Sequence, residues 1–406
     1  MRTSSPHIVI VGANFAGLAA ATSFGPQDNV TVFDQSASFE CLPNIHELVS
    51  GLKRSSDLQL SREKIIARSG HTFRQQKVAE LLPEKHQVIT DDGTPYIYDV
   101  CIVAVGGINN TYGIPGVNRW SLPFKSCADC AEIGRRLKNL AAGAQPFSIV
   151  IVGGGLEGIE SLGEILRLCG RSQLMQVHLV NQAPRLISEA PEVIDRDIKS
   201  LCHAYPITFY NNTAVTQLKE NKVSLSNGLE LHTDLTIWTG GAAPSPFLYR
   251  SGLAAQSGQW ASVKPTLQSQ FNNTVFVAGD AAMVEPPLSK QGYHAIDMGS
   301  LVAQNCKRLL KGRAMQEFKP SGKPTLLSFG DVMTYLIAGQ TVFASPALAS
   351  MKEGVYHYIM ALFDRPSHTS GIINLVQRSI RTTEKRILPS VTSLKTMLGF
   401  AHVRIL

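Results

Sequence analysis

The chain has 406 residues, of which 44% are apolar and 17% charged, a balance typical of a globular protein with two or three domains. No run of eighteen apolar residues occurs, so we expect no transmembrane helix, and the N-terminal stretch lacks a cleavage-like ending, so we expect no signal peptide. The net charge is +7 without any nucleic-acid-binding signature, and the seven cysteines are scattered and odd in number, which favours a reducing, cytoplasmic location over a disulfide framework.

Residues 8–17, IVIVGANFAG, predict a buried parallel strand, a glycine turn and a helix of small residues. Gly12 and Gly17 match the outer glycines of the G-x-G-x-x-G fingerprint of dinucleotide-binding units, and Asn14 replaces the middle one. Because asparagine adopts left-handed or bridge conformations more readily than other non-glycine residues, we expect the site to tolerate it. Asp34 follows the next strand, NVTVF, where a carboxylate can accept hydrogen bonds from an adenosine ribose.

Two cysteines, Cys127 and Cys130, form a C-x-x-C pair that could be a redox site with a lowered thiol pKa. The surrounding residues, PFKSCADCAEIGRRL, instead predict the start of a helix with Ser126 as its N-cap. We favour this structural interpretation because short motifs have a high false-positive rate.

The opening motif recurs, since IVIVG occupies both 8–12 and 149–153. The second copy carries a complete fingerprint at Gly153, Gly155 and Gly158. Each copy is followed by a similar strand that ends in a double glycine, YDVCIVAVGG and TDLTIWTGG. Backbone N–H groups of a glycine turn and the positive end of the next helix favour a diphosphate, so the repeat predicts two dinucleotide sites. FAD is expected at the first site rather than FMN, which lacks the adenosine.

A later strand, NNTVFVAGD, ends at Asp280 and looks like the second flavin signature of two-dinucleotide flavoproteins, in which the aspartate bonds the ribitol of FAD. From residue 7 to about 345, the order of motifs resembles the pyridine nucleotide–disulfide oxidoreductase superfamily, in particular its type II NADH dehydrogenases, sulfide:quinone oxidoreductases and apoptosis-inducing-factor-like reductases. The resemblance implies an α/β fold with two Rossmann-like, doubly wound dinucleotide-binding domains, the second inserted in the first, and a C-terminal α/β region. It implies a FAD domain at 1–112 and 264–325, an NAD(P)H domain at 113–263 and a C-terminal region at 326–406.

Local segments extend this resemblance. FECLPNIHELVSG resembles the segment beside the isoalloxazine of type II NADH dehydrogenases, which implicates Pro43, and GGGLEGIESLGEIL places Glu160 near the nicotinamide with Glu164 one turn on. The segment LLSFGDVMTYLIAG looks like the strand pair that follows the flavin domain. SKQGYHAIDMG lacks the A-Q-x-A-x-Q pattern of these dehydrogenases and is closer to sulfide:quinone oxidoreductases. Cys127 lies near the first redox cysteine of that family, but no cysteine follows the GGGLEG loop or precedes Lys290 at the matching places, so sulfide oxidation is not expected. The acceptor stays open between a quinone and a small organic molecule.

These motifs define the candidate residues. The expected catalytic candidates are Glu160, Lys290, Tyr293 and His294. The expected FAD contacts are Gly12, Asn14, Phe15, Ala16, Gly17, Asp34, Pro43, Ala104, Gly106, Asp280, Gln291 and Gly292. The expected NAD(P)H contacts are Gly153, Gly155, Gly158, Asn181 and Gly240, and no metal site is expected. Asn181 stands where an acid would bond the ribose of NADH and repel a 2′-phosphate, and Arg185 is close in sequence, so NADH and NADPH both stay open.

From residue 351 onward the chain has eight basic and three acidic residues, a balance of +5. In SGIINLVQRSIRTTEKRIL, apolar and basic residues recur at helical spacing on different sides, as in a basic amphipathic helix. Such a helix can lie on an anionic membrane surface, or it can pack on the body or in a homodimer. Resemblance to type II dehydrogenases favours a peripheral attachment to the cytoplasmic face of the membrane.

The preferred function is an FAD-dependent NAD(P)H oxidoreductase that passes electrons to a quinone-like or small organic acceptor. A specialised biosynthetic flavoenzyme on the same scaffold is the alternative, because the quinone motif is missing. A flavin-binding redox sensor with a decayed NAD(P)H site is the second alternative, supported by Asn14 and Asn181 alone.

Overall fold

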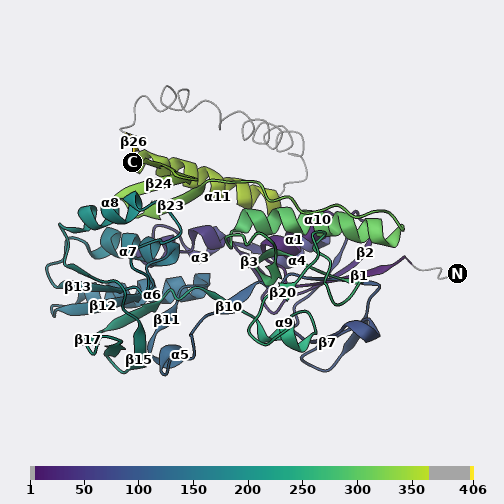
Figure 1. The fold of residues 1–406 in the computed structure, drawn as a ribbon, viewed down its shortest axis with the longest axis horizontal. Coiled ribbons are helices and arrows are strands. Elements are labelled where there is room, and N and C mark those ends of the chain that lie inside the picture. Colours follow the sequence, from purple (N-terminus) through teal and green to yellow (C-terminus); the bar gives the residue numbers. More distant parts are fainter. Residues whose placement is uncertain (1–4, 365–402) are drawn as a thin grey trace. The chain divides into compact units, whose positions relative to one another are not determined.

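The structure is a computed structural model, and it describes residues 5–364 and 403–406 (Figure 1). The chain forms two compact units, each assembled from three segments. The first unit contains Met1–Glu40, Gln59–Asn110 and Ala242–Ser321, and the second contains Cys41–Leu58, Thr111–Gly241 and Gly322–Leu406. The predicted limits of the cofactor domains stay predictions, and the division differs from them at 41–58, which joins the second unit, and at 242–263, which joins the first.

A five-stranded parallel sheet forms the centre of the first unit, in the order β21-β9-β1-β2-β5. Its strands are β1 (His7–Val11), β2 (Asn29–Phe33), β5 (Thr72–Arg74), β9 (Val100–Val103) and β21 (Val275–Val277). All residues of β9 and β21 are buried, as expected for apolar, β-branched strands covered on both faces. The buried parallel strand predicted at residues 8–11 is confirmed, because β1 pairs in parallel with β2 and β9.

Two helices of the first unit, α1 (Phe15–Ala21) and α10 (Gly292–Leu310), pack directly on one another (Figure 1). Gly299 permits this approach, because a Cβ at that position would lie 2.1 Å from the carbonyl oxygen of Ala16. The other helices, turns and strands of the unit are β3 (Ser38–Glu40), β4 (Gln59–Ser61), α4 (Arg62–Arg68), β6 (Val78–Leu82), η2 (Pro83–Lys85), β7 (Gln87–Thr90), β8 (Pro95–Ile97), β10 (Gly107–Asn109), β19 (Ala242–Pro244), α9 (Pro246–Arg250), β20 (Ala261–Ser262), η3 (Gly279–Ala281) and β22 (Ala282–Met283).

The second unit repeats the same architecture with a parallel sheet in the order β11-β18-β12-β13-β14. Its strands are β11 (Leu122–Pro123), β12 (Phe147–Val152), β13 (Met175–Val180), β14 (Ile207–Tyr210) and β18 (Leu235–Trp238). Its longer helices are α6 (Cys127–Ala142), α7 (Leu156–Cys169) and α8 (Val193–Cys202). Helix α6 begins where predicted, because the Ser126 side chain accepts a hydrogen bond from the Asp129 backbone.

The last part of the chain adds an antiparallel sheet, β23-β24-β25-β26, to the second unit. Its strands are β23 (Thr325–Phe329), β24 (Met333–Ala338), β25 (Thr341–Ala344) and β26 (Arg404–Ile405), so the strand pair predicted from LLSFGDVMTYLIAG is confirmed. Helix α7 lies close to β23 because Gly163 and Gly330 have no side chains, and a Cβ on Gly163 would lie 2.3 Å from the Gly330 nitrogen.

The remaining elements of the second unit are η1 (Leu42–Asn44), α2 (Glu47–Ser50), α3 (Ser55–Leu58), α5 (Val117–Trp120), β15 (Val215–Lys219), β16 (Lys222–Leu225), β17 (Glu230–His232), η4 (Pro346–Leu348) and α11 (Ala349–Phe363). Within residues 5–364 and 403–406, no helix is both long and apolar enough to span a membrane. The basic amphipathic helix expected at 370–388 lies outside the described residues.

Candidate functional site

The glycine turn after β1 forms a tight cradle in the first unit. Gly12 has φ 94°, and a Cβ there would lie 2.4 Å from the carbonyl oxygen of Ala104 at the end of β9. A Cβ on Gly17 would lie 1.8 Å from the carbonyl oxygen of Gly12. Only glycine fits at both positions, so the turn can bring its backbone N–H groups close to a ligand.

The turn after β12 has the same geometry in the second unit. Gly153 has φ 114°, and a Cβ there would lie 2.5 Å from the carbonyl oxygen of Thr239, the residue before Gly240. A Cβ on Gly158 would lie 1.9 Å from the carbonyl oxygen of Gly153. Gly155 caps helix α7 without any side-chain bond, which leaves the first N–H groups of this 14-residue helix available to a diphosphate.

The backbone of Asn14 differs from what the sequence led us to expect, which was a left-handed or bridge conformation. It has φ −100° and ψ −142°, so the position requires no left-handed conformation, and Gly155 in the second cradle also has a negative φ of −78°. The side-chain oxygen of Asn14 accepts a weak 3.3 Å hydrogen bond from the Glu40 backbone. Asparagine is therefore tolerated because the backbone is ordinary and its side chain has a partner, rather than because it can adopt unusual dihedrals.

Asp34 lies beside the first cradle, as predicted. Arg62, which the sequence did not indicate, holds its carboxylate there. Arg62 is buried on α4, and its guanidinium donates to Asp34 at 2.8 Å and to the carbonyl oxygens of Ala13 and Ser36, each at 2.6 Å. Asp34 also accepts a 2.7 Å bond from the Ala13 backbone. No motif points to an arginine 28 residues from its partner, so only the fold reveals that Arg62 fixes both the turn and the carboxylate.

Asn181 occupies the matching place in the second unit. Its oxygen accepts a 3.3 Å bond from the Gly154 backbone, and its amide nitrogen donates to the carbonyl oxygens of Ala183 at 3.2 Å and Arg185 at 2.9 Å. An aspartate could not donate these two bonds. The Arg185 guanidinium binds the carbonyl oxygens of Ser188 at 2.5 Å and Ala190 at 2.6 Å, so this loop uses both side chains for its own structure.

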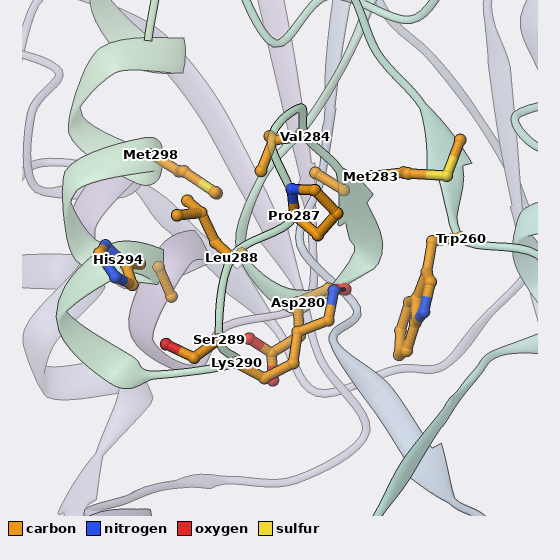
Figure 2. A pocket seen from close by; sticks show the side chains of 13 residues that line it. Trp260, Asp280, Met283, Val284, Pro287, Leu288, Ser289, Lys290, His294 and Met298 are labelled. Atoms are coloured by element: carbon orange, nitrogen blue, oxygen red, sulfur yellow. Dashed lines mark hydrogen bonds between the residues drawn. The ribbon is translucent and has the colours of Figure 1, made fainter. Parts of the chain in front are cut away.

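A cavity of about 130 Å³ lies beside the Gly-Asp turn of the first unit (Figure 2). Apolar side chains form much of its wall, namely Trp260, Met283, Val284, Pro287, Leu288 and Met298. Asp280, Lys290 and His294 also line it, so the structure brings three of the predicted site residues together. The Lys290 ammonium donates to the Asp280 carbonyl oxygen at 2.6 Å and lies 4.0 Å from the centre of the Trp260 ring, where desolvation lowers its pKa.

Helix α10 begins beside this cavity. Gln291 is its N-cap and makes no side-chain cap bond, because its amide instead donates to Ser289 at 2.8 Å. The Gln291 side chain therefore does not cap this 19-residue helix, whose positive N-terminal end can stabilise a nearby negative charge. A Cβ on Gly292 would lie 3.1 Å from the Phe15 ring, and Tyr293 contacts the neighbouring His294 ring edge-on.

Glu160 lies in a buried polar cluster of the second unit that the sequence did not indicate. It pairs with Lys352 of α11, and its carboxylate lies 3.7 Å from Nε2 of His46. Burial raises the pKa of Glu160, and the Lys352 charge opposes this. Glu164, one turn later, pairs with Arg167 at 2.6 Å, and burial raises its pKa to about 7.

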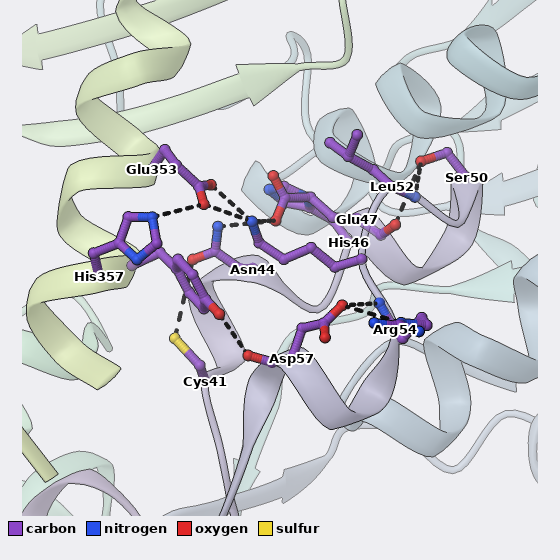
Figure 3. A network of polar contacts seen from close by, with 12 residues as sticks. Cys41, Asn44, His46, Glu47, Ser50, Leu52, Arg54, Asp57, Glu353 and His357 are labelled. Atoms are coloured by element: carbon purple, nitrogen blue, oxygen red, sulfur yellow. Dashed lines mark hydrogen bonds and ion pairs between the residues drawn. The ribbon is translucent and has the colours of Figure 1, made fainter. Parts of the chain in front are cut away.

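The segment around Pro43 packs on the N-terminal half of α11 (Figure 3). Lys53 donates to Glu353 at 2.8 Å and lies 3.6 Å from Glu47, while the Tyr356 hydroxyl donates to the Asp57 carbonyl oxygen at 2.6 Å. These bonds join residues about 300 positions apart within the second unit. Pro43 itself lies in the short turn η1 that begins this segment.

All seven cysteines are buried thiols, and the C-x-x-C pair is no exception. Cys127 and Cys130 are inside the core on the first turn of α6. Burial raises the pKa of Cys41 to about 12 and that of Cys169 to about 11. The burial of the pair favours the structural interpretation of this motif.

Comparison with known proteins places this geometry in a family. The pyridine nucleotide-disulphide oxidoreductase family matches residues 6–299. The chain belongs to this family. The membership confirms the resemblance seen in the sequence, the α/β fold with two dinucleotide-binding sheets, the oxidoreductase activity and the use of FAD and a nicotinamide nucleotide.

Two relatives of known activity align with most of this chain. Demethylphylloquinone reductase NdbB of Synechocystis is 25% identical over 384 residues, which cover 88% of this chain and 93% of the relative. Type II NADH:quinone oxidoreductase of Staphylococcus aureus is 22% identical over 352 residues, which cover 80% and 87%.

Two solved structures share the fold. The sulfide:quinone oxidoreductase of Aquifex aeolicus superimposes with a TM-score of 0.78 at 18% identity and covers 91% of this chain and 95% of its own. NDH2 of Plasmodium falciparum in complex with NADH has a TM-score of 0.77 at 14% identity, with coverages of 88% and 95%.

The residues around the first cradle fit FAD. Gly12 and Gly17 permit the tight turn that presents its backbone N–H groups, and Asp34 keeps a carboxylate beside it that three bonds hold in place. Asp280 lies in η3, the short turn that follows β21, between the buried residues Gly279 and Ala281. The second cradle fits the diphosphate of a nicotinamide nucleotide on the same grounds.

Proposed function

We propose that the protein is an FAD-dependent NAD(P)H oxidoreductase that reduces a quinone. The observation that carries the proposal is the doubled glycine cradle, one in each unit, in which a Cβ at any of four glycines would collide with backbone atoms. A flavin site and a nicotinamide nucleotide site are what hydride transfer between the two cofactors needs. The family match and two quinone-reducing relatives support the acceptor class.

The chain's own residues would bind and orient the cofactors. When bound, FAD would supply the chemistry of accepting a hydride and releasing two electrons. Gly12 and Gly17 would hold its diphosphate, Asp34 its ribose and Asp280 its ribitol, while the positive start of α10 at Gly292 would favour negative charge on the ring. Phe15, Ala16, Ala104 and Gly106 would complete the walls of this site.

In the second unit, Gly153, Gly155 and Gly158 would hold the diphosphate of the nicotinamide nucleotide. Glu160 follows on the same helix, and its buried carboxylate would orient the nicotinamide region. Asn181 carries no charge that would repel a 2′-phosphate, and Gly240 follows the strand that faces the cradle. We infer that both NADH and NADPH are accepted.

The cavity beside Asp280 supports a small organic acceptor as the second candidate. Its apolar wall and volume of about 130 Å³ suit a single ring, and Lys290 with His294 would supply polar contacts. A narrow acceptor range, rather than activity with many quinones, would favour this specialised role.

We further propose that the basic tail attaches the protein to the cytoplasmic face of an anionic membrane. The charge balance of +5 after residue 350 supports this, and a homodimer is the alternative. Flotation with anionic vesicles, but not with neutral ones, is expected. Loss of flotation when Arg378, Arg381 and Lys385 are replaced by serine would link it to the tail, whereas vesicle-independent dimers in sedimentation would contradict it.

The test of the main proposal is steady-state oxidation of NADH and of NADPH with a series of quinone analogues. The expected result is quinone-dependent oxidation of both nucleotides by the flavin-containing protein. Oxidation with one small organic acceptor alone would favour the second candidate, and no oxidation with any acceptor would contradict both.

A further inference from the structure

A lysine and a glutamate form a close ion pair beside the second glycine cradle. The Lys125 ammonium lies 2.6 Å from each carboxylate oxygen of Glu157. Glu157 lies on the first turn of α7, between Gly155 and Gly158 of the fingerprint. The acid therefore belongs to the turn at which the diphosphate of a nicotinamide nucleotide is expected.

The register of the parallel sheet brings Lys125 to the same edge as the cradle. Strands β11, β18 and β12 run parallel, and Pro123, Trp238 and Val152 stand in one row across them. Lys125 follows Pro123 by two residues, just as Gly154 follows Val152. Ligands of open parallel sheets bind at this carboxyl edge, so the lysine lies at the ligand-binding side of the sheet.

The strand order also indicates which part of a nucleotide passes the pair. Asn181, where the ribose of the adenosine half is expected, follows β13 on one side of β12, whereas Lys125 follows β11 on the other side. A dinucleotide whose diphosphate lies at the start of α7 extends from there in both directions. Its adenosine half would lie toward β13, and its nicotinamide half toward β18 and β11.

Glu157 by itself would make the cradle unfavourable for an anion. The N-terminus of a helix acts like roughly half a positive charge, and a full negative charge on the same turn outweighs it. With Lys125 in place, the charges of the two side chains cancel, and the positive end of α7 remains. Because a diphosphate is strongly negative, this balance decides whether the turn attracts or repels it.

The next acid of the same helix is neutralised in the same way. Glu160, which follows Glu157 by three residues on α7, pairs with Lys352 of α11. Stability alone does not account for the Lys125 pair, because the lysine side chain is 24% exposed and that of Glu157 37% exposed. Ion pairs with such exposure contribute little to the free energy of unfolding.

We propose that Lys125 is a positioning residue of the nicotinamide nucleotide site, which cancels the charge of Glu157 so that the second cradle can bind a diphosphate. This inference rests on the proposed function and adds a residue to its second cofactor site. Lys125 acts through Glu157 and needs no contact of its own with the nucleotide. Its replacement therefore weakens binding only while Glu157 is present and charged.

Binding without turnover tests this role. Titration of the flavin-containing protein with ADP-ribose, which has the diphosphate but cannot reduce flavin, gives the dissociation constant of each variant. In Lys125→Met this constant should rise about 10-fold, because the unpaired Glu157 repels the diphosphate, and in Glu157→Gln it should fall severalfold. The double variant has the same local charge as the wild type, so its constant should stay within about twofold of the wild-type value.

Ionic strength gives a second readout that a merely structural role would not change. Repulsion between partly exposed charges is screened by salt, and at 1 M salt the Debye length is only about 3 Å. The loss of affinity in Lys125→Met should therefore shrink to about twofold or less at that concentration. A loss that is independent of salt would overturn the proposal.

NAD⁺ tests where the pair lies along the nucleotide. Its nicotinamide ring carries a positive charge that ADP-ribose lacks, and the unpaired Glu157 of Lys125→Met would attract this charge. The loss of affinity should therefore be about threefold smaller for NAD⁺ than for ADP-ribose. Equal losses would overturn the placement of the pair on the nicotinamide side.

A matched control removes another paired lysine of the same unit. Lys222 pairs with Glu230 at 2.5 Å in the antiparallel sheet β15-β16-β17, which is separate from the parallel sheet. Lys222→Met makes the same change in net charge, and its affinity for ADP-ribose should match that of the wild type. Lys125→Arg keeps the positive charge and should bind ADP-ribose as the wild type does.

The outcomes separate this role from direct contact and from the proposed function. Wild-type affinity in Lys125→Met, or a double variant as weak as Lys125→Met, would overturn the proposal. If Lys125→Met does not fold, Glu157→Gln carries the test, because binding no tighter than wild type would equally overturn it. A wild-type protein that binds neither ADP-ribose nor NAD⁺ would instead contradict the second cofactor site and the proposed function with it.

Discussion

Replacing Asn181 by aspartate tests whether this position reads the nucleotide or holds the loop together. An acid here would be expected to bond a ribose and to favour NADH over NADPH. In this structure, however, the amide nitrogen of Asn181 donates to the carbonyl oxygens of Ala183 and Arg185. Aspartate would place an oxygen against each of these carbonyls in a side chain that is 7% exposed.

The magnitude follows from these bonds. Two lost hydrogen bonds cost about 1 kcal/mol each, and a buried acceptor left facing carbonyls adds about 1–3 kcal/mol, so we expect about 3–5 kcal/mol of destabilisation. The new carboxyl would have a raised pKa in the folded state, because its protonated form can still donate to a carbonyl. Stability would therefore be greatest at low pH and would fall as pH rises through that pKa.

Thermal unfolding at about pH 5 and pH 8 checks this prediction. Asn181→Asp should melt below the wild type at both values, with the larger difference at the higher pH. Asn227→Asp serves as the control, because Asn227 is exposed and uses only its oxygen, as an acceptor from the Leu229 backbone. An Asn181→Asp protein as stable as this control, with a gain in NADH preference, would refute the structural interpretation of Asn181.

Three further predictions follow from single contacts. Gly158→Ala should abolish bleaching of the flavin by NADH, because its Cβ would lie 1.9 Å from a carbonyl oxygen, whereas Gly155→Ala, which has open space, should fold normally and only weaken nucleotide binding in a titration. Arg62→Met should destabilise the protein by about 3–5 kcal/mol in denaturant unfolding and release FAD, since it leaves Asp34 uncompensated, and retention of bound flavin would argue against this role. Glu164 has a folded-state pKa of about 7, above its unfolded value, so its contribution to stability is present at low pH and is lost as pH rises through about 7. Between about pH 4.5 and 7, the melting temperature should fall more steeply with rising pH in the wild type than in Glu164→Gln. Parallel curves would refute the raised pKa of Glu164.

The sequence predicted the repeated parts of the fold because their physical signals are local. A β-branched strand followed by a glycine turn identifies both cradles, and the geometry of Gly12 and Gly153 shows why no other residue fits. Ser126 identified the start of α6 for the same reason, since a cap acts within one turn.

The parts that the sequence did not reveal depend on contacts between distant segments. Arg62 reaches Asp34 across 28 residues, and Lys352 reaches Glu160 across 192 residues. No spacing rule connects such pairs. Nothing in the sequence distinguished His46 from the other residues of the segment around Pro43. Its position between two carboxylates follows from packing within the second unit.

The most direct test of the central claim is a single anaerobic experiment on the purified, flavin-containing protein. NADH is added first and a quinone second, while the visible absorbance of the flavin is followed. The account predicts rapid bleaching by NADH and full recovery with quinone. Absorbance that does not change on adding either NADH or NADPH would contradict it.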